Sequence, residues 1–221
     1  MSLRKKWYLC GMKRHFFIFC LLLVAHALEA QLWQAVELPD SVFLRMQGRS
    51  YPADCPVART DLRYLQVLHW DAEGESRQGE LVCNKTIAQD LQDIFKQLYK
   101  AKYPIASMRL IDDFDASDER SMTANNTSCF NFRYITGTKT VSKHGRGMAI
   151  DINPLYNPYV RLRDNHVEPA AGKPYAKRRA ERTDIPMKID RTDLCYRLFV
   201  KHGFKWGGDW KSVKDYQHFE K

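Results

Sequence analysis

Two segments that lie far apart in the chain carry histidine and carboxylate side chains at short spacing. In the first, residues 142–151, His144 precedes Asp151 by seven residues, with two glycines between them. In the second, at the end of the sequence, Asp215 precedes His218 by three residues. Two imidazoles and one carboxylate are a normal set of protein ligands for a catalytic zinc ion, which keeps a fourth position open for water. The pattern predicts a fold that brings both segments together, with His144, Asp151 and His218 as zinc ligands.

Asp215 is then left over as a carboxylate near the metal-bound water, where it could act as a general base. Residues three apart share a face of a helical turn but point to opposite faces of a regular strand. We therefore expect a bulge or turn at Tyr216–Gln217 in a final strand over residues 213–219. Glu220 is the alternative base, because it follows His218 by two residues on the same strand face. We prefer Asp215.

The glycines of the first segment bear on how its two ligands could reach one ion. Gly145 and Gly147 lie between His144 and Asp151 and allow the backbone to turn tightly. The short apolar run at residues 148–150 could pass through the core and hold Asp151 in place.

The first thirty residues are typical of an export signal. Lys13 and Arg14 precede an apolar run at residues 16–25, which is too short to span a bilayer comfortably. A cleavage site fits at residues 25–27, and Ala30 is a second candidate. We expect an exported protein of the periplasm or cell envelope. An uncleaved N-terminal anchor is the alternative, and it would be the only membrane contact.

Four cysteines follow this segment, and an oxidising compartment would allow them to pair in three ways. They are Cys55, Cys83, Cys129 and Cys195. Cys195 lies in a helical apolar pattern, so a buried thiol and a disulfide both remain open for it.

The charge balance argues against a nucleic-acid partner. The formal net charge is +9, and part of that excess lies in the first thirty residues. No stripe of Lys and Arg interleaved with aromatic residues stands out in the remainder. We predict no nucleic-acid binding and a monomeric protein.

A length of 221 residues suits one domain. Residues 31–56 are broken repeatedly by proline and glycine, and we interpret them as an N-terminal arm laid over a domain at residues 57–221. Within that domain, residues 153–189 form a basic, proline-containing insertion. It is either a rim over the site or a solvated, poorly ordered connection.

Local patterns predict an α+β fold, a small antiparallel β-sheet packed with helices. Residues 62–70 and 81–83 read as a hairpin. An apolar stripe from Ile87 to Leu98 predicts a helix with a capping box at Thr86 and Gln89. A second helix is expected over residues 190–203, capped by Asp190 or Thr192. A strand at residues 107–111 leads into the acidic run 112–119, which is a solvated loop or, alternatively, a calcium site.

The sequence SKHGRGMAID at residues 142–151 resembles the S-x-H-x-x-G-x-A-x-D signature of the M15 peptidase family. WGGDW at residues 206–210, followed by a closing D-x-x-H-F-E, is similar to the second signature of its endolysin-like branch. The resemblance implies the Hedgehog/DD-peptidase-like α+β fold, with His144, Asp151 and His218 on zinc and Asp215 as acid/base.

The same resemblance assigns further roles around the metal. Arg133 corresponds to the family's arginine that stabilises the substrate carbonyl. Ser142 is the serine of the motif and would line or support the site. Trp206 and Trp210 match aromatics near the cleft, although packing alone could explain both.

The resemblance implies a zinc metallopeptidase that hydrolyses peptidoglycan stem peptides in cell-wall remodelling. Both D-alanyl-D-alanine carboxypeptidase and L-alanyl-D-glutamate endopeptidase activity remain open. The alternative is a non-catalytic, zinc-containing binding module of the same fold, similar to Hedgehog amino-terminal domains. Such a module needs the ligands but neither Asp215 nor Arg133. A structural zinc would instead need a fourth protein ligand.

Overall fold

The computed structural model describes residues 33–135, 137–178 and 182–221. The predicted export signal or anchor lies outside these residues. Within the described ranges, no helix combines the length and the apolar character needed to cross a bilayer. The structure mixes helices with small antiparallel sheets and therefore confirms the α+β class. The more specific Hedgehog/DD-peptidase-like fold stays a prediction.

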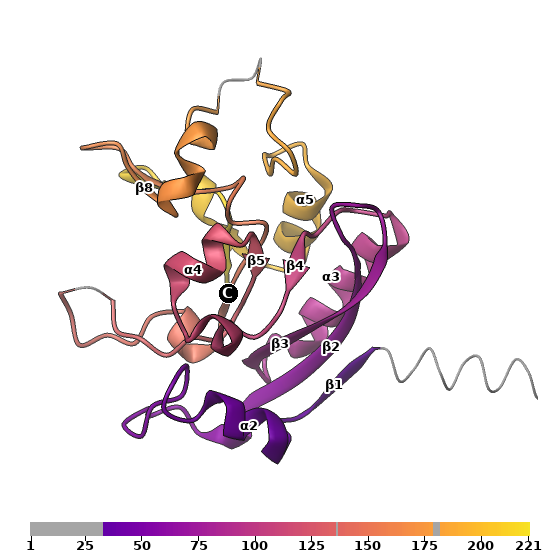
Figure 1. Cartoon of the computed structure of the whole chain (residues 1–221), viewed down its shortest axis with the longest axis vertical. Helices are drawn as coiled ribbons and strands as arrows, with labels where there is room; N and C mark the ends of the chain where they lie inside the picture. The colour runs from indigo at the N-terminus through magenta and orange to yellow at the C-terminus, as the bar shows by residue number, and fades with distance from the viewer. Residues whose placement is uncertain (1–32, 136, 179–181) are drawn as a thin grey trace, which may run out of the picture.

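The predicted hairpin is the longest β feature of the molecule (Figure 1). Strands β2 (Leu62–Trp70) and β3 (Ser76–Asn84) pair antiparallel over their full length. Strand β1 (Gln34–Glu37) pairs with the other edge of β2. A single 3₁₀ turn, η1 (Arg59–Asp61), leads into β2. The resulting sheet is a platform for the core.

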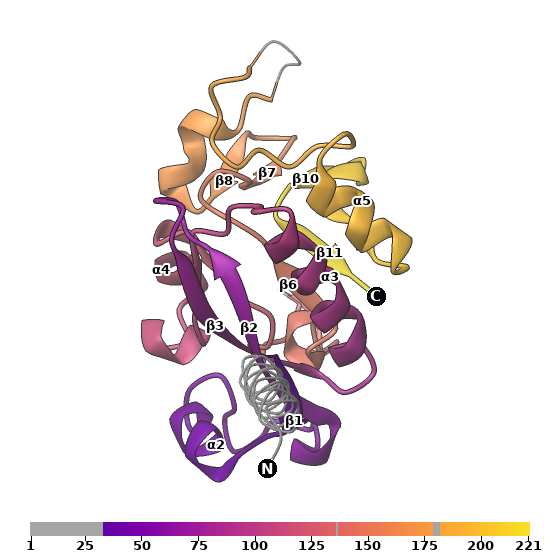
Figure 2. The same cartoon turned by 90° about the vertical axis from the view of Figure 1, so that its right-hand side faces the viewer.

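Helix α3 (Ala88–Lys100) packs between this sheet and the C-terminal elements, as Figure 2 shows. All five residues of its predicted apolar stripe are buried, and they share one core with β6, β11 and α5: Ile87, Leu91, Ile94, Phe95 and Leu98. The predicted capping box is wrong. Ile87 occupies the N-cap and no side chain caps the helix. Instead, the backbone N–H and the hydroxyl of Thr86 both donate hydrogen bonds to the side-chain oxygen of Asn84. The Thr86 hydroxyl is therefore engaged with Asn84 and does not cap the helix.

Helix α5 (Leu194–Lys201) is shorter than predicted, and its cap is a different residue. Asp193 caps it by accepting a hydrogen bond from the backbone N–H of Cys195 at 2.8 Å. Asp190 is not available because its carboxylate binds Thr192. The four cysteines are all free thiols, and Cys195 is fully buried, so the disulfide alternative for Cys195 is not supported.

The N-terminal arm contributes more regular structure than its sequence indicated. Besides β1 it contains helix α2 (Asp40–Met46), which the prolines and glycine nearby had obscured. A second apolar cluster joins α2 to the hairpin through Val42, Met46, Leu62 and Val82.

The acidic segment that follows α3 is folded rather than a solvated loop. The predicted strand shrinks to β4 (Ser107–Met108), which pairs parallel with β5 (Asn126–Thr127). The carboxylate of Asp112 is buried and accepts hydrogen bonds from the backbone N–H and hydroxyl of Ser50 at 3.0 and 2.9 Å. Burial raises the pKa of Asp112. This contact fastens the arm to the domain. The segment also forms η2 (Ile111–Phe114) and α4 (Asp118–Thr123).

The C-terminal segment that was predicted as one strand is two strands in two different sheets. Strand β11 (His218–Glu220) lies between β6 (Ala149–Asp151) and β9 (Lys205–Trp206). Strand β10 (Val213–Asp215) is paired elsewhere, with the 153–189 insertion. The chain changes sheet at Tyr216–Gln217, where we expected an interruption.

The described part of the insertion is folded against the domain. Strands β7 (Tyr159–Arg161) and β8 (His166–Glu168) form a hairpin that pairs with β10. After η4 (Ala170–Tyr175), the guanidinium of Arg178 donates to the carbonyls of Tyr156 and Ile189 and lies 4.5 Å from the centre of the Tyr216 ring. This part of the insertion is a rim rather than a solvated connection.

Gly147 offers a test of the fold. It has φ +68°, and a Cβ there would lie 2.6 Å from the backbone nitrogen of Asn84. Gly74 has φ +78° but open space around it. We expect Gly74→Ala to lose about 1–2 kcal/mol of stability from backbone strain. Gly147→Ala should lose at least about 1 kcal/mol more, because the collision with β3 adds to the strain. Urea unfolding of both variants measures the difference, and equal losses would contradict the close approach.

Candidate metal centre

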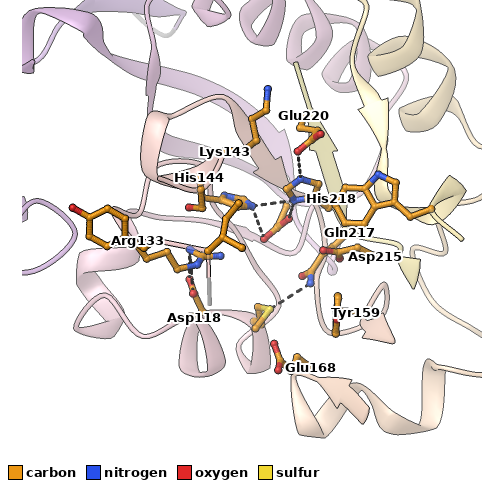
Figure 3. Close-up of a pocket in the computed structure, with 16 residues that line it drawn as sticks. Asp118, Arg133, Lys143, His144, Tyr159, Glu168, Asp215, Gln217, His218 and Glu220 are labelled. Carbon is orange, nitrogen blue, oxygen red and sulfur yellow. Dashed lines mark hydrogen bonds and ion pairs between the residues drawn. The ribbon is translucent and has the colours of Figure 1, made fainter. Parts of the chain in front are cut away.

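The three predicted zinc ligands lie together in the structure. His144 Nε2 is 3.1 Å from His218 Nδ1 and 3.3 Å from Asp151 Oδ2, and His218 Nδ1 is 3.1 Å from Asp151 Oδ1 (Figure 3). Within the described ranges, this is the one group of His, Cys, Asp and Glu residues whose spacing suits a metal ion. The fold therefore brings the two motifs into contact.

These separations fit a zinc ion. Nitrogen and oxygen ligands lie about 2.0–2.2 Å from zinc in a tetrahedral site, so neighbouring ligand atoms are about 3.3 Å apart. The separation of 3.1 Å between the two imidazole nitrogens, and those of 3.1 and 3.3 Å from them to the two different oxygens of Asp151, are close to that edge length. Two neutral imidazoles and a carboxylate are also the donor set expected for a catalytic zinc. The three residues present therefore fit a zinc ion.

Strand pairing explains why Asp151 and His218 point at the same place. They are direct partners in the antiparallel pair of β6 and β11. Directly opposite residues in such a pair project their side chains to the same face with Cβ atoms about 5 Å apart. Ser128 forms a β-bridge to Asp151 from the other side, so the backbone of this ligand is held from both sides.

His144 reaches the same point from a 3₁₀ turn, η3 (His144–Arg146), rather than from a strand. The hydroxyl of Ser142 accepts a hydrogen bond from the backbone N–H of Gly145 at 2.9 Å and stabilises that turn. Gly147 ends it in the left-handed conformation. The Nδ1–H of His144 donates to the carbonyl of Cys129 at 2.7 Å. This bond leaves the lone pair of Nε2 pointing at the cluster, as a metal ligand requires.

Glu220 supports His218 from behind. Its carboxylate lies 3.3 Å from His218 Nε2, on the side of the ring away from the other ligands. A carboxylate that accepts the second N–H of a ligand histidine fixes the ring and its tautomer. Glu220 was the alternative base, but this contact gives it an orienting position instead. Alternation along β11 places it on the same face as His218, so the sequence did contain this signal.

The charges in the cluster favour a cation at its centre. Burial alone would lower the pKa of His218, but hydrogen bonds to Asp151 and Glu220 outweigh burial and raise it. Burial would likewise raise the pKa of Asp151, yet the two histidines hold it well below its usual range. Asp151 and Glu220 therefore stabilise positive charge at the centre of the cluster.

Asp215 has the properties expected of a proton carrier. Its Oδ1 atom is buried and has no hydrogen-bond partner in the structure. Burial raises the pKa of this carboxyl to about 6, and the negative charge of Asp151 adds to the effect. A pKa close to neutrality lets a carboxylate accept a proton and return it.

A cavity of about 510 Å³ opens in front of the cluster, and all three ligands and Asp215 line it. Arg133 lies on its wall in an ion pair with Asp118 at 3.1 Å. The Arg133 side chain remains 40% exposed, so a substrate could reach the guanidinium. Lys143 lies on the wall near Glu220 (Figure 3).

The two tryptophans have different environments. Trp210 lines the cavity, and its ring centre is 5.2 Å from that of His218. Trp206 is buried in the core, where its indole N–H donates to the carbonyl of Tyr216 and its ring packs beside Phe219. Trp206 does not line the cavity, so its position supports a packing role rather than the predicted substrate contact. The turn η5 (Gly207–Asp209) connects them.

Three further residues of the cavity wall carry no functional signal in the sequence. Asp118 comes from α4, and Tyr159 and Glu168 come from the insertion hairpin. None of them lies in a motif, and only tertiary pairing places them near the metal ligands.

Comparison with known families supports the same conclusion. Residues 136–221 match the M15 peptidase model that is described as D-alanyl-D-alanine carboxypeptidase. The match spans all three candidate ligands and Asp215, whereas Arg133 lies just before it. No solved structure matches the chain.

The match and the cluster together support a peptidase. Over residues 136–221 the chain is similar to M15 peptidases, as the motif resemblance predicted.

The metal assignment predicts that His144→Ala loses bound zinc, because removal of one of three ligands leaves an incomplete site. His166→Ala is the matched control, since this exposed histidine pairs with Glu168 outside the cluster. Elemental analysis of the purified variants should give about one zinc ion per chain for the wild type and the control. Zinc retained at full stoichiometry by His144→Ala would contradict the assignment.

Zinc affinity should fall as the pH falls, because a protonated imidazole cannot bind the metal. The raised pKa of His218 places this competition above the ordinary histidine range. We expect the zinc Kd to rise by up to about tenfold per pH unit from pH 8 to pH 6. Glu220→Gln removes one of the contacts that raise the pKa and should move the dependence to lower pH. A Kd that does not change over this range would exclude proton competition at His218.

Proposed function

We propose that this protein is a zinc-dependent peptidase that hydrolyses peptidoglycan stem peptides, as a D-alanyl-D-alanine carboxypeptidase or an L-alanyl-D-glutamate endopeptidase. One observation carries the proposal: a metal-ligand cluster and a carboxylate with one buried, unpartnered oxygen line the same cavity. The family match supports a peptidase acting on peptidoglycan at the level of the family.

A zinc ion held by His144, Asp151 and His218 would lower the pKa of a bound water and polarise the scissile carbonyl. Asp215 would take the proton of that water through its unpaired oxygen and pass it to the leaving amine. The cavity in front of these groups admits the peptide.

Arg133 would stabilise the negative charge that develops on the carbonyl oxygen. Its guanidinium lies on the cavity wall, and Asp118 holds it there through one ion pair. A fixed cation directed at a developing oxyanion needs no reorganisation during the reaction, which is the main source of such stabilisation. Ser142 acts less directly, by maintaining the turn that carries His144.

The surroundings of Asp215 favour an enzyme over a zinc-containing binding module. Burying a carboxylate oxygen without a partner costs free energy, and a module without chemistry has no use for it. A purely structural zinc is also disfavoured, because the cluster supplies three ligands rather than the four typical of such sites.

Peptidoglycan lies outside the cytoplasmic membrane, so this function requires export. We therefore propose that residues 1–30 direct the protein to the periplasm or cell envelope, by a cleaved signal or an uncleaved anchor. Fractionation of expressing cells, with the N-terminal sequence of the mature protein, tests the proposal. Recovery of the intact chain in the cytoplasm alone would contradict it.

The activity itself can be tested with purified muropeptides and mass spectrometry. Loss of a terminal alanine indicates carboxypeptidase action, and a cut after the first alanine indicates endopeptidase action. We expect Asp215→Ala to keep its zinc but to lose at least about 100-fold in hydrolysis rate, because general base catalysis contributes that much. Normal cleavage by Asp215→Ala would exclude it as the base, and wild-type protein that cleaves neither bond would exclude the proposed function.

A further inference from the structure

A row of three side chains leads from the candidate base to the outer end of the cavity. Asp215 on β10 is directly opposite Tyr159 on β7, and Tyr159 is directly opposite Glu168 on β8. Directly opposite residues in antiparallel strands project to the same face. All three line the cavity. In Figure 3, Tyr159 and Glu168 lie on the side of the cavity away from Lys143 and Glu220.

Strand spacing sets the length of the row. Adjacent strands are about 4.8 Å apart, so the backbone at Glu168 lies about 10 Å from that at Asp215. A peptide in extended conformation advances about 3.3 Å per residue. A substrate group bound at Glu168 could therefore belong to the backbone of a residue about three positions away from the scissile bond. It could also lie at the end of a long side chain of a residue that is closer to that bond.

The charge at this end of the cavity is negative. Glu168 is half-exposed and accepts a hydrogen bond from the imidazole of His166 at 2.7 Å, which leaves its second oxygen for a ligand. Arg161 on β7 does not neutralise it, because both oxygens of Asp164 bind that guanidinium. Arg133 is paired with Asp118. The phenol of Tyr159, next to Glu168, adds an oxygen that can accept a further hydrogen bond.

We propose that Tyr159 and Glu168 form a subsite that binds a protonated primary amine of the substrate. This inference rests on the proposed function and gives the substrate a chemical class: a peptide with a free ammonium group. The group could be on the side chain of a diamino acid or at the amino terminus of a peptide freed from its glycan. An ammonium group from either source would make the same contacts with the carboxylate of Glu168 and the phenol of Tyr159.

The test uses binding, so that it does not depend on turnover. Three synthetic stem peptides are compared: one acetylated on neither amine, one only on the side chain and one only on the amino terminus. Their affinities for zinc-loaded Asp215→Ala, in which cleavage is blocked, are measured by calorimetry. Acetylation of the recognised amine should weaken binding about fivefold, as expected for a partly exposed ion pair. The amine whose acetylation matters identifies the source.

The same measurement in the Asp215→Ala/Glu168→Gln protein should show no discrimination between amine and acetylated peptide. Tyr159→Phe, introduced into Asp215→Ala protein that retains Glu168, should reduce the difference in affinity between the amine and the acetylated peptide without abolishing it. Glu73→Gln, in the exposed turn between β2 and β3, is the matched control and should leave it unchanged. Equal binding of all three peptides, or full discrimination without Glu168, would overturn the subsite. If the Asp215→Ala variant distinguishes the peptides but the wild-type protein cleaves none of them, the amine subsite is supported and the proposed peptidase activity is rejected.

Discussion

The antiparallel pairing of β6 with β11 is the constraint on which the site depends. It makes Asp151 and His218 direct neighbours on one face, and the ligand distances follow from that register. A shift of one residue would turn one of the two side chains to the opposite face. The core protects this register, because Ile150 and Phe219, the adjacent partners, are both fully buried. Packing on one face of the strand pair thus sets the chemistry on the other.

The remaining groups of the site are fixed by polar contacts rather than by the core. His144 depends on a hydrogen-bonded turn and on a carbonyl acceptor. The register already places His218, and the contact with Glu220 fixes its ring orientation in addition. Asp215 differs from both, because it is buried without a partner for one oxygen. The site therefore combines satisfied ligands, which hold geometry, with one unsatisfied carboxylate, whose pKa is raised by its surroundings.

The sequence was sufficient for the elements whose signal is local. The apolar stripe of α3, the hairpin of β2 and β3, and the interruption at Tyr216–Gln217 could all be predicted from periodicity and spacing. The spacing also identified the three residues that cluster. The caps of α3 and α5 were assigned to the wrong residues, since nearby Asn and Asp side chains compete for the same backbone groups. The cavity residues of the insertion could not be predicted, because only the pairing of β7 and β8 with β10 brings them there.

Because the chain changes sheet between Asp215 and His218, the candidate metal site and the candidate base are supported by two different sheets. Two of the candidate metal ligands, Asp151 and His218, belong to a sheet braced by the core, whereas Asp215 belongs to a sheet whose other strands come from the insertion. Substitutions in that hairpin can therefore change the surroundings of Asp215 and the cavity wall while the pairing of β6 with β11 stays intact. Such an arrangement makes the insertion hairpin a module that can be exchanged without changing the strand register behind the ligand cluster.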